Sequence, residues 1–120
     1  ETYGKPIYLT SEERNLLFNA DLPNEHLRRV RDIFVFQCLI GARVGDLTKL
    51  TKANIQNNIL SYIPRKTKEG NPVTVQIPLH PMAIEILNRY DMPGEALLPF
   101  ISGQRYNNYI KELLEVAGLT

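Results

Sequence analysis

The chain has 120 residues, a length that predicts one domain with a hydrophobic core of its own. Hydrophobic residues make up 43% of it and charged residues 22%, which is typical of a globular protein and argues against disorder as the main state. With 14 Lys and Arg against 13 Asp and Glu, the formal net charge is +1. This charge neither requires nor excludes a nucleic-acid partner.

The rare residue types exclude several classes of site. Two histidines and one cysteine, Cys38, are too few ligands for a transition-metal site, so we expect no metal and no other cofactor. Cys38 lies in the most apolar run, where burial raises the pKa of a thiol and makes it a poor nucleophile. No stretch is apolar for the roughly 18 residues of a transmembrane helix, and the first residues lack the apolar part of a signal peptide. We therefore expect a cytoplasmic protein with no membrane partner.

Helix caps and chain breakers divide the chain into elements. Residues 1–9 are expected to form an extended arm or linker remnant, because Gly4 and Pro6 interrupt them, and residues 10–120 the folded unit. The predicted helices, in chain order, run from the capping box of Thr10 and Glu13 to about Ala20, from Glu25 to Ile40 after the cap Asn24, from Val44 to about Thr51, from Met82 to about Tyr90, and from the cap Ser102 to Ala117 before Gly118.

Two strands are predicted between the third and fourth of these helices. Residues 54–58 are polar and turn-prone, and Ile59 to Ile63 then begins a strand pattern. Val73 to Ile77 alternates with period two and is rich in branched residues. The two segments predict an antiparallel hairpin, so the expected class is α+β, mainly α: a helical bundle with a small antiparallel hairpin or sheet.

The first chemical feature is an arginine at the edge of the predicted core. The apolar run 33–40 ends at Gly41, and Arg43 and Asp46 then share one side of the next helix, opposite its apolar side. A guanidinium held between two buried helices, with a carboxylate beside it, is suited to binding an anion in fixed geometry. The alternative is a helix corner with a surface ion pair, which contributes little.

The second chemical feature is the basic loop of the hairpin. Arg65, Lys66 and Lys68 lie there with Thr67 among them, and a projecting hairpin tip with basic side chains can contact phosphates. The alternative is a lysine-rich loop that only increases solubility.

Placed in order, these motifs resemble the tyrosine recombinases, the phage-type integrase family. The segment Gly41 to Leu50 resembles the family's first arginine box, in which Gly-x-Arg is followed by an acidic residue and Leu or Ile. Lys66-Thr67, followed by Ile77-Pro-Leu79, is similar to the catalytic-lysine hairpin. Tyr8 to Glu13 resembles the start of the catalytic domain, and Ile101 to Leu119 resembles the helix before the second box.

The resemblance implies part of a site-specific DNA recombinase or integrase that cuts and rejoins DNA through a covalent 3′-phosphotyrosine, without a metal. Arg43 would contact the non-bridging phosphate oxygens, Lys66 would protonate the departing 5′ hydroxyl, and Asp46 would support Arg43. Lys66 is preferred to Lys68 because Thr follows it, and the choice stays open. The implied partners are double-stranded DNA and other recombinase protomers of the full-length protein, with further DNA contacts expected from Arg65, Thr67, Lys68, Lys49, Gln104 and Arg105.

The chain also departs from the family pattern. The second box, His-x-x-Arg, and the later nucleophilic tyrosine do not follow Leu119. His26-Leu-Arg-Arg29 has the spelling but precedes Arg43, and Tyr106 and Tyr109 fall on an apolar stripe that predicts core packing. We expect an incomplete catalytic domain, inactive alone, with exposed apolar surface. The alternatives are a non-enzymatic helix-turn-helix DNA-binding module that uses Val44 to Thr51 as its recognition helix, and a protein-interaction domain.

Overall fold

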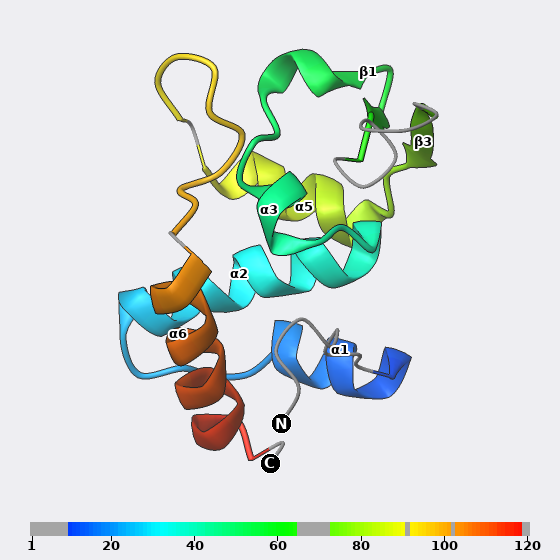
Figure 1. Ribbon diagram of the computed structural model, residues 1–120. Coiled ribbons are helices and arrows are strands. Elements are labelled where there is room, and N and C mark those ends of the chain that lie inside the picture. The colour runs from blue at the N-terminus through cyan, green and yellow to red at the C-terminus, as the bar shows by residue number, and fades with distance from the viewer. Residues whose placement is uncertain (1–9, 65–72, 91, 102, 119–120) are drawn as a thin grey trace.

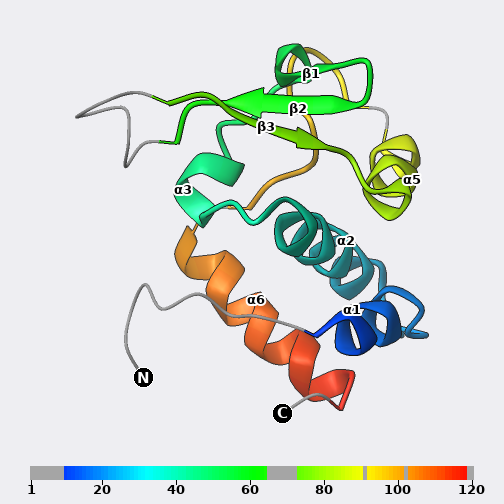
Figure 2. The same cartoon turned by 90° about the vertical axis from the view of Figure 1, so that its right-hand side faces the viewer.

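The helix α2, Glu25–Ile40, lies at the centre of the fold in the computed structural model, which describes residues 10–64, 73–90, 92–101 and 103–118. Helices α1 (Ser11–Phe18), α5 (Pro81–Arg89) and α6 (Gly103–Val116) all pack against α2. A three-stranded antiparallel sheet lies on the side of α2 away from α1 and α6 (Figures 1 and 2). The predicted class, α+β and mainly α, is confirmed.

Helices α1 and α2 begin where their caps predict. The side chains of Thr10 and Glu13 each accept a hydrogen bond from the other residue's N–H, both at 3.0 Å, which confirms the capping box. Asn24 Oδ1 accepts from the N–H of Leu27 at 2.8 Å at the start of α2. Gly41 ends α2 with φ +70°, a left-handed conformation that favours glycine.

The sheet contains the predicted hairpin and one strand that the sequence analysis missed. Strands β2 (Ile59–Tyr62) and β3 (Val75–Pro78) pair antiparallel with Tyr62 opposite Val75. The segment expected to be only a turn contains β1 (Ile55–Gln56), which pairs with β2. β1 can pair with β2 because residues 57–58 form a tight two-residue turn between them. Both asparagines of this turn have positive φ (53° and 62°), as such a turn requires.

The helix after Gly41 is shorter than predicted. α3 covers only Val44–Leu47, not the segment to Thr51. The N–H groups of Lys49 and Leu50 bond the carbonyls three residues back, at 3.2 Å each, and this tighter turn ends the helix. Thr51 then forms an antiparallel bridge to Ala96, and the 3-10 helix η1 (Lys52–Asn54) follows. Tertiary pairing of the chain therefore overrides the apolar period that predicted a longer helix.

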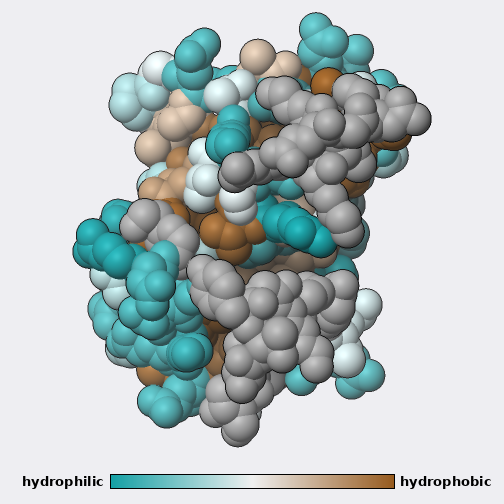
Figure 3. Space-filling model, viewed as in Figure 1, coloured by the Kyte–Doolittle hydropathy of each residue, from teal (hydrophilic) through white to brown (hydrophobic). Residues whose placement is uncertain are grey.

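Hydrophobic surface is exposed, as the sequence analysis expects. The side chains of Leu16 on α1 and Val116 on α6 are 58% and 48% exposed, and a shallow groove of about 460 Å³ lies beside Leu16 and Ala117. On the face shown in Figure 3 the outer side of α6 is hydrophilic, and hydrophobic side chains show between α6 and the half that carries the sheet. Among the described residues, no helix has both the length and the apolar character needed to cross a membrane.

Candidate functional site

Arg43 lies at the N-cap of α3 with an exposed side chain. Its backbone carbonyl accepts from the N–H groups of Asp46 and Leu47 at 3.0 and 2.8 Å, so the first turn of α3 fixes the arginine's main chain. No hydrogen bond or ion pair of the guanidinium is found within the described part of the chain. A cation on a fixed backbone, with its head in solvent, is available to bind an anion.

Asp46 shows that the turn carrying Arg43 lies near the strand β2. Asp46 is half-buried on α3, and burial first and the negative charge of Asp46 second raise the pKa of Tyr62 above its ordinary value. That charge acts on Tyr62 only because α3 lies close to the last residue of β2. The turn that carries Arg43 and Asp46 is therefore next to the end of the sheet where β2 stops and β3 starts (Figure 2).

Other predicted DNA contacts lie toward the same end of the molecule. Lys49 is exposed just after α3, and Gln104 and Arg105 are exposed in the first turn of α6, which begins below α3 in Figure 2. Arg105 donates to the hydroxyl of Tyr109 at 3.1 Å, so this cation is partly held in place. The catalytic-lysine prediction and its neighbours, Arg65, Lys66, Thr67 and Lys68, lie outside the described residues.

A polar connection between α2, Ala42 and α6 was not predicted from the sequence. Gln37, in the last turn of α2, donates from Nε2 to the carbonyl of Ala42 at 3.0 Å, and its Oε1 accepts from the hydroxyl of Tyr106 at 2.8 Å. Tyr106 is fully buried, which confirms its predicted place in the core, and its hydroxyl has a partner. This contact could have been suspected from the sequence, because the helical period places Gln37 on the side of α2 that carries buried residues.

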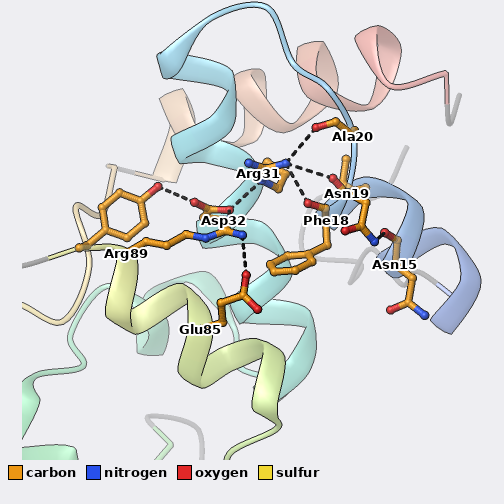
Figure 4. Close-up of polar contacts among 10 residues, drawn as sticks. Asn15, Phe18, Asn19, Ala20, Arg31, Asp32, Glu85 and Arg89 are labelled. Carbon is orange, nitrogen blue, oxygen red and sulfur yellow. Dashed lines mark hydrogen bonds and ion pairs between the residues drawn. The ribbon is translucent and has the colours of Figure 1, made fainter.

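A second missed feature is the buried ion pair of Arg31 and Asp32, shown in Figure 4. This pair was not predicted from the sequence, yet Arg31 is only 6% exposed and Asp32 only 2% exposed. Arg31 Nε donates to Asp32 at 2.7 Å, and its Nη1 donates to the carbonyls of Phe18 and Ala20. The helical period indicates this burial too, because Arg31 follows Leu27 by four residues and so lies on the apolar side of the helix.

Asp32 gathers donors from two helices. Besides Arg31, it accepts from Arg89 Nη1 at 2.8 Å and from the Tyr90 hydroxyl at 2.6 Å. Burial first, and then the hydrogen bond and charge of Asp32, raise the pKa of Tyr90 above its ordinary value. The carboxylate of Asp32 thus has three donors, as a buried polar group requires.

This network borders a surface pocket of about 370 Å³ rich in arginine. Each of these cations already has a partner: Arg28 donates to the carbonyl of Leu22, Arg29 lies 3.5 Å from Glu25, and Arg89 also bonds Glu85. Arg89 further lies 4.7 Å from the centre of the Phe18 ring. The arrangement joins the end of α1 to α2 and α5, so its role is structural.

Neither Cys38 nor a metal centre is a candidate site among the described residues. Cys38 is half-buried, and burial raises the pKa of its thiol to about 11 although the charge of Arg14 acts in the opposite direction. Among the described residues, no group of three or more His, Cys, Asp and Glu side chains could hold a metal ion.

The candidate site is the surface around Arg43 and Asp46, next to the end of the sheet where β2 stops and β3 starts. Comparison with protein-family models and with curated protein sequences finds no match to this chain.

Proposed function

We propose that this chain is part of the catalytic domain of a tyrosine recombinase, with the fold of the DNA breaking-rejoining enzymes, and that it binds duplex DNA through the surface around Arg43. In this proposal Arg43 binds the non-bridging oxygens of the phosphate that is cut, and Lys66 protonates the departing 5′ hydroxyl. The chain alone does not cleave DNA, because the resemblance assigns none of its tyrosines as nucleophile.

The observation that carries the proposal is the placement of Arg43. Its side chain is exposed, its backbone is fixed by α3, and the turn that it shares with Asp46 lies beside the end of β2 from which the basic hairpin loop leaves. A phosphodiester bound there would meet a guanidinium that can donate two parallel hydrogen bonds. Such donors stabilise the negative charge that develops on the phosphate oxygens in the transition state, because they need little reorganisation.

The alternatives gain no support from the same residues. The helix-turn-helix hypothesis needs a recognition helix from Val44 to Thr51, whereas α3 has four residues and its Leu47 is fully buried. The protein-interaction hypothesis would gain support if Arg43 were buried in an ion pair facing away from the hairpin, whereas Arg43 is exposed.

The test is a titration of the chain with a long fluorescent mixed-sequence duplex, followed by anisotropy at several salt concentrations. We expect Arg43→Ala to weaken binding about tenfold, as the loss of a charge-assisted hydrogen bond to phosphate does. The variant should also lower the slope of log affinity against log salt by about one, because one phosphate contact is lost. Lys66→Ala and Lys68→Ala, tested separately, compare the two hairpin lysines.

The matched control is Arg29→Ala. Arg29 is a surface arginine in the first turns of α2, at the other end of that helix from Arg43, and its variant removes the same charge. We expect it to change neither the affinity nor the salt slope beyond error. Equal losses for the two variants, or no binding of DNA by the chain, would overturn the proposal.

A further inference from the structure

Gln37 connects three parts of the chain at the point where α2 ends, through its side chain and its backbone carbonyl. Its side-chain Nε2 donates to the carbonyl of Ala42 at 3.0 Å, and its side-chain Oε1 accepts from the Tyr106 hydroxyl at 2.8 Å. Its backbone carbonyl accepts from the N–H of Gly41 at 2.8 Å. One residue thus holds the left-handed glycine, the residue before Arg43 and the helix α6. We call Gln37 and Tyr106 together the glutamine brace.

The bond to Ala42 acts directly on the main chain of Arg43. The carbonyl of Ala42 and the nitrogen of Arg43 belong to one planar peptide unit, so a hydrogen bond that fixes this carbonyl also fixes the direction in which the chain enters Arg43. The carbonyl of Arg43 is held in turn by the N–H groups of α3. Arg43 is therefore restrained on both sides, and only its side chain is left to move in solvent.

The chemistry of the groups fixes the orientation of the brace. A carbonyl can only accept, so the amide of Gln37 must turn its NH₂ toward Ala42 and its oxygen toward Tyr106. The hydroxyl of Tyr106 must then donate, which requires its protonated form. Burial first, and the nearby Cys38 second, raise the pKa of Tyr106 well above its ordinary value and keep it protonated. The arrangement has a single hydrogen-bonding pattern near neutral pH.

The burial of Tyr106 argues that its hydroxyl has a specific role. The residue is 0% exposed and its ring fills the core between α2 and α6, a task that Phe performs equally well. A buried hydroxyl is costly unless it is hydrogen-bonded, and here its partner is the side chain that reaches the residue before Arg43. A second tyrosine bond, from Tyr90 to Asp32, belongs to the network at α5 and has no contact with Gln37.

We propose that Gln37 and Tyr106 are positioning residues that hold the backbone of Arg43 in the conformation in which its guanidinium binds a DNA phosphate. The inference rests on the proposed function of Arg43 and adds how α6 contributes to that site. Neither residue touches the DNA in this scheme. Their effect reaches the phosphate only through Arg43.

The experiment is a double-mutant cycle on DNA affinity, measured by anisotropy with the duplex described above. Tyr106→Phe removes only the hydroxyl, and Gln37→Met removes both polar atoms at nearly constant volume. We expect each to weaken binding roughly three- to tenfold, the range of one lost hydrogen bond, and to lower the salt slope toward that of Arg43→Ala. In the Arg43→Ala background neither substitution should weaken binding further.

The control is Tyr90→Phe, which loses a tyrosine hydrogen bond of similar length at Asp32 and should leave DNA affinity unchanged. Thermal unfolding followed by circular dichroism selects a temperature at which every variant is folded. If Tyr106→Phe does not fold, Gln37→Met carries the test.

Each outcome separates the two proposals. If Arg43→Ala leaves DNA binding unchanged, the proposed function of Arg43 is wrong. If Arg43→Ala weakens binding while Tyr106→Phe and Gln37→Met do not, only the positioning inference is overturned. It is also overturned if the losses persist in the Arg43→Ala background, because the brace would then act on the fold and not through Arg43.

Discussion

At the scale of single residues, Cys38 gives a prediction about pH. Burial raises the pKa of this thiol from 9.0 to about 11. Below both values the folded protein holds about 100-fold less thiolate than the unfolded chain, a ratio set by two pKa units. We expect a thiol reagent at pH 8 to modify the native protein correspondingly slowly and the urea-unfolded protein fast.

The same shift predicts a direction for stability. From pH 9 to about 11 the unfolded chain loses the Cys38 proton while the folded chain keeps it, so the free energy of unfolding falls as the pH rises through this window. Cys38→Ala should remove part of this fall. Equal thiol reactivity of folded and unfolded protein at pH 8 would show that Cys38 is not shielded.

The buried ion pair gives a second prediction at this scale. Asp32→Asn keeps the shape of the side chain but leaves the buried cation of Arg31 without its counter-charge. We expect a loss of about 3 kcal/mol in the free energy of unfolding, because breaking a buried pair leaves an uncompensated charge. Urea unfolding measures it. Glu85→Gln, which breaks the exposed pair with Arg89, should cost less than about 1 kcal/mol. Similar losses for both variants would contradict the structural role of Asp32.

At the scale of elements, two glycines near Arg43 form a matched pair. Gly41 ends α2 with φ +70°, whereas Gly45 lies within α3 without such a φ, and an added methyl group meets nothing within 4 Å at either position. Gly41→Ala should therefore destabilise the protein by about 1 kcal/mol through backbone strain alone. Gly45→Ala should stabilise it by roughly 0.5 kcal/mol, because alanine loses less entropy in a helix.

Thermal or urea unfolding distinguishes the two glycine variants. Opposite signs for Gly41→Ala and Gly45→Ala are the expected result. If Gly41→Ala left the free energy of unfolding unchanged, the turn before Arg43 would have another conformation in solution. The hydrogen bond from Gln37 to Ala42 would then not fix the backbone of Arg43.

At the scale of the whole molecule, the proposed function predicts DNA binding without cleavage. A duplex with a nick near the cleavage position traps covalent recombinase intermediates, which migrate as protein–DNA adducts on a denaturing gel. We expect none from this chain, because the resemblance assigns none of its tyrosines as the nucleophile. Tyr106 and Tyr90 also use their hydroxyls in hydrogen bonds inside the fold, and burial raises the pKa of both. An adduct would show that one of the six tyrosines is a nucleophile and that the assignment of roles is incomplete.

Local signals in the sequence determined most of the elements. The caps Thr10 and Asn24 and the glycine Gly41 act within a few residues of themselves, so α1 and α2 begin where the sequence predicts and α2 also ends there. α1 ends at Phe18, before the predicted Ala20. The short strand β1 was missed because it pairs with β2 through a turn of two asparagines with positive φ. The same two residues are also common in a polar loop without strands, so the sequence did not distinguish the two. α3 was predicted too long because the bridge from Thr51 to Ala96 joins segments far apart in the chain.

For the candidate site, Arg43 and Asp46 and their common side of one turn could be predicted from the sequence, because helical spacing is local. Tertiary contacts place this turn against the end of β2, where Asp46 acts on Tyr62. They also bring Gln37 to Tyr106 on α6 and bury Arg31 and Asp32. These contacts join helices that are distant in sequence, and the energy of a buried polar group depends on partners that no local pattern specifies.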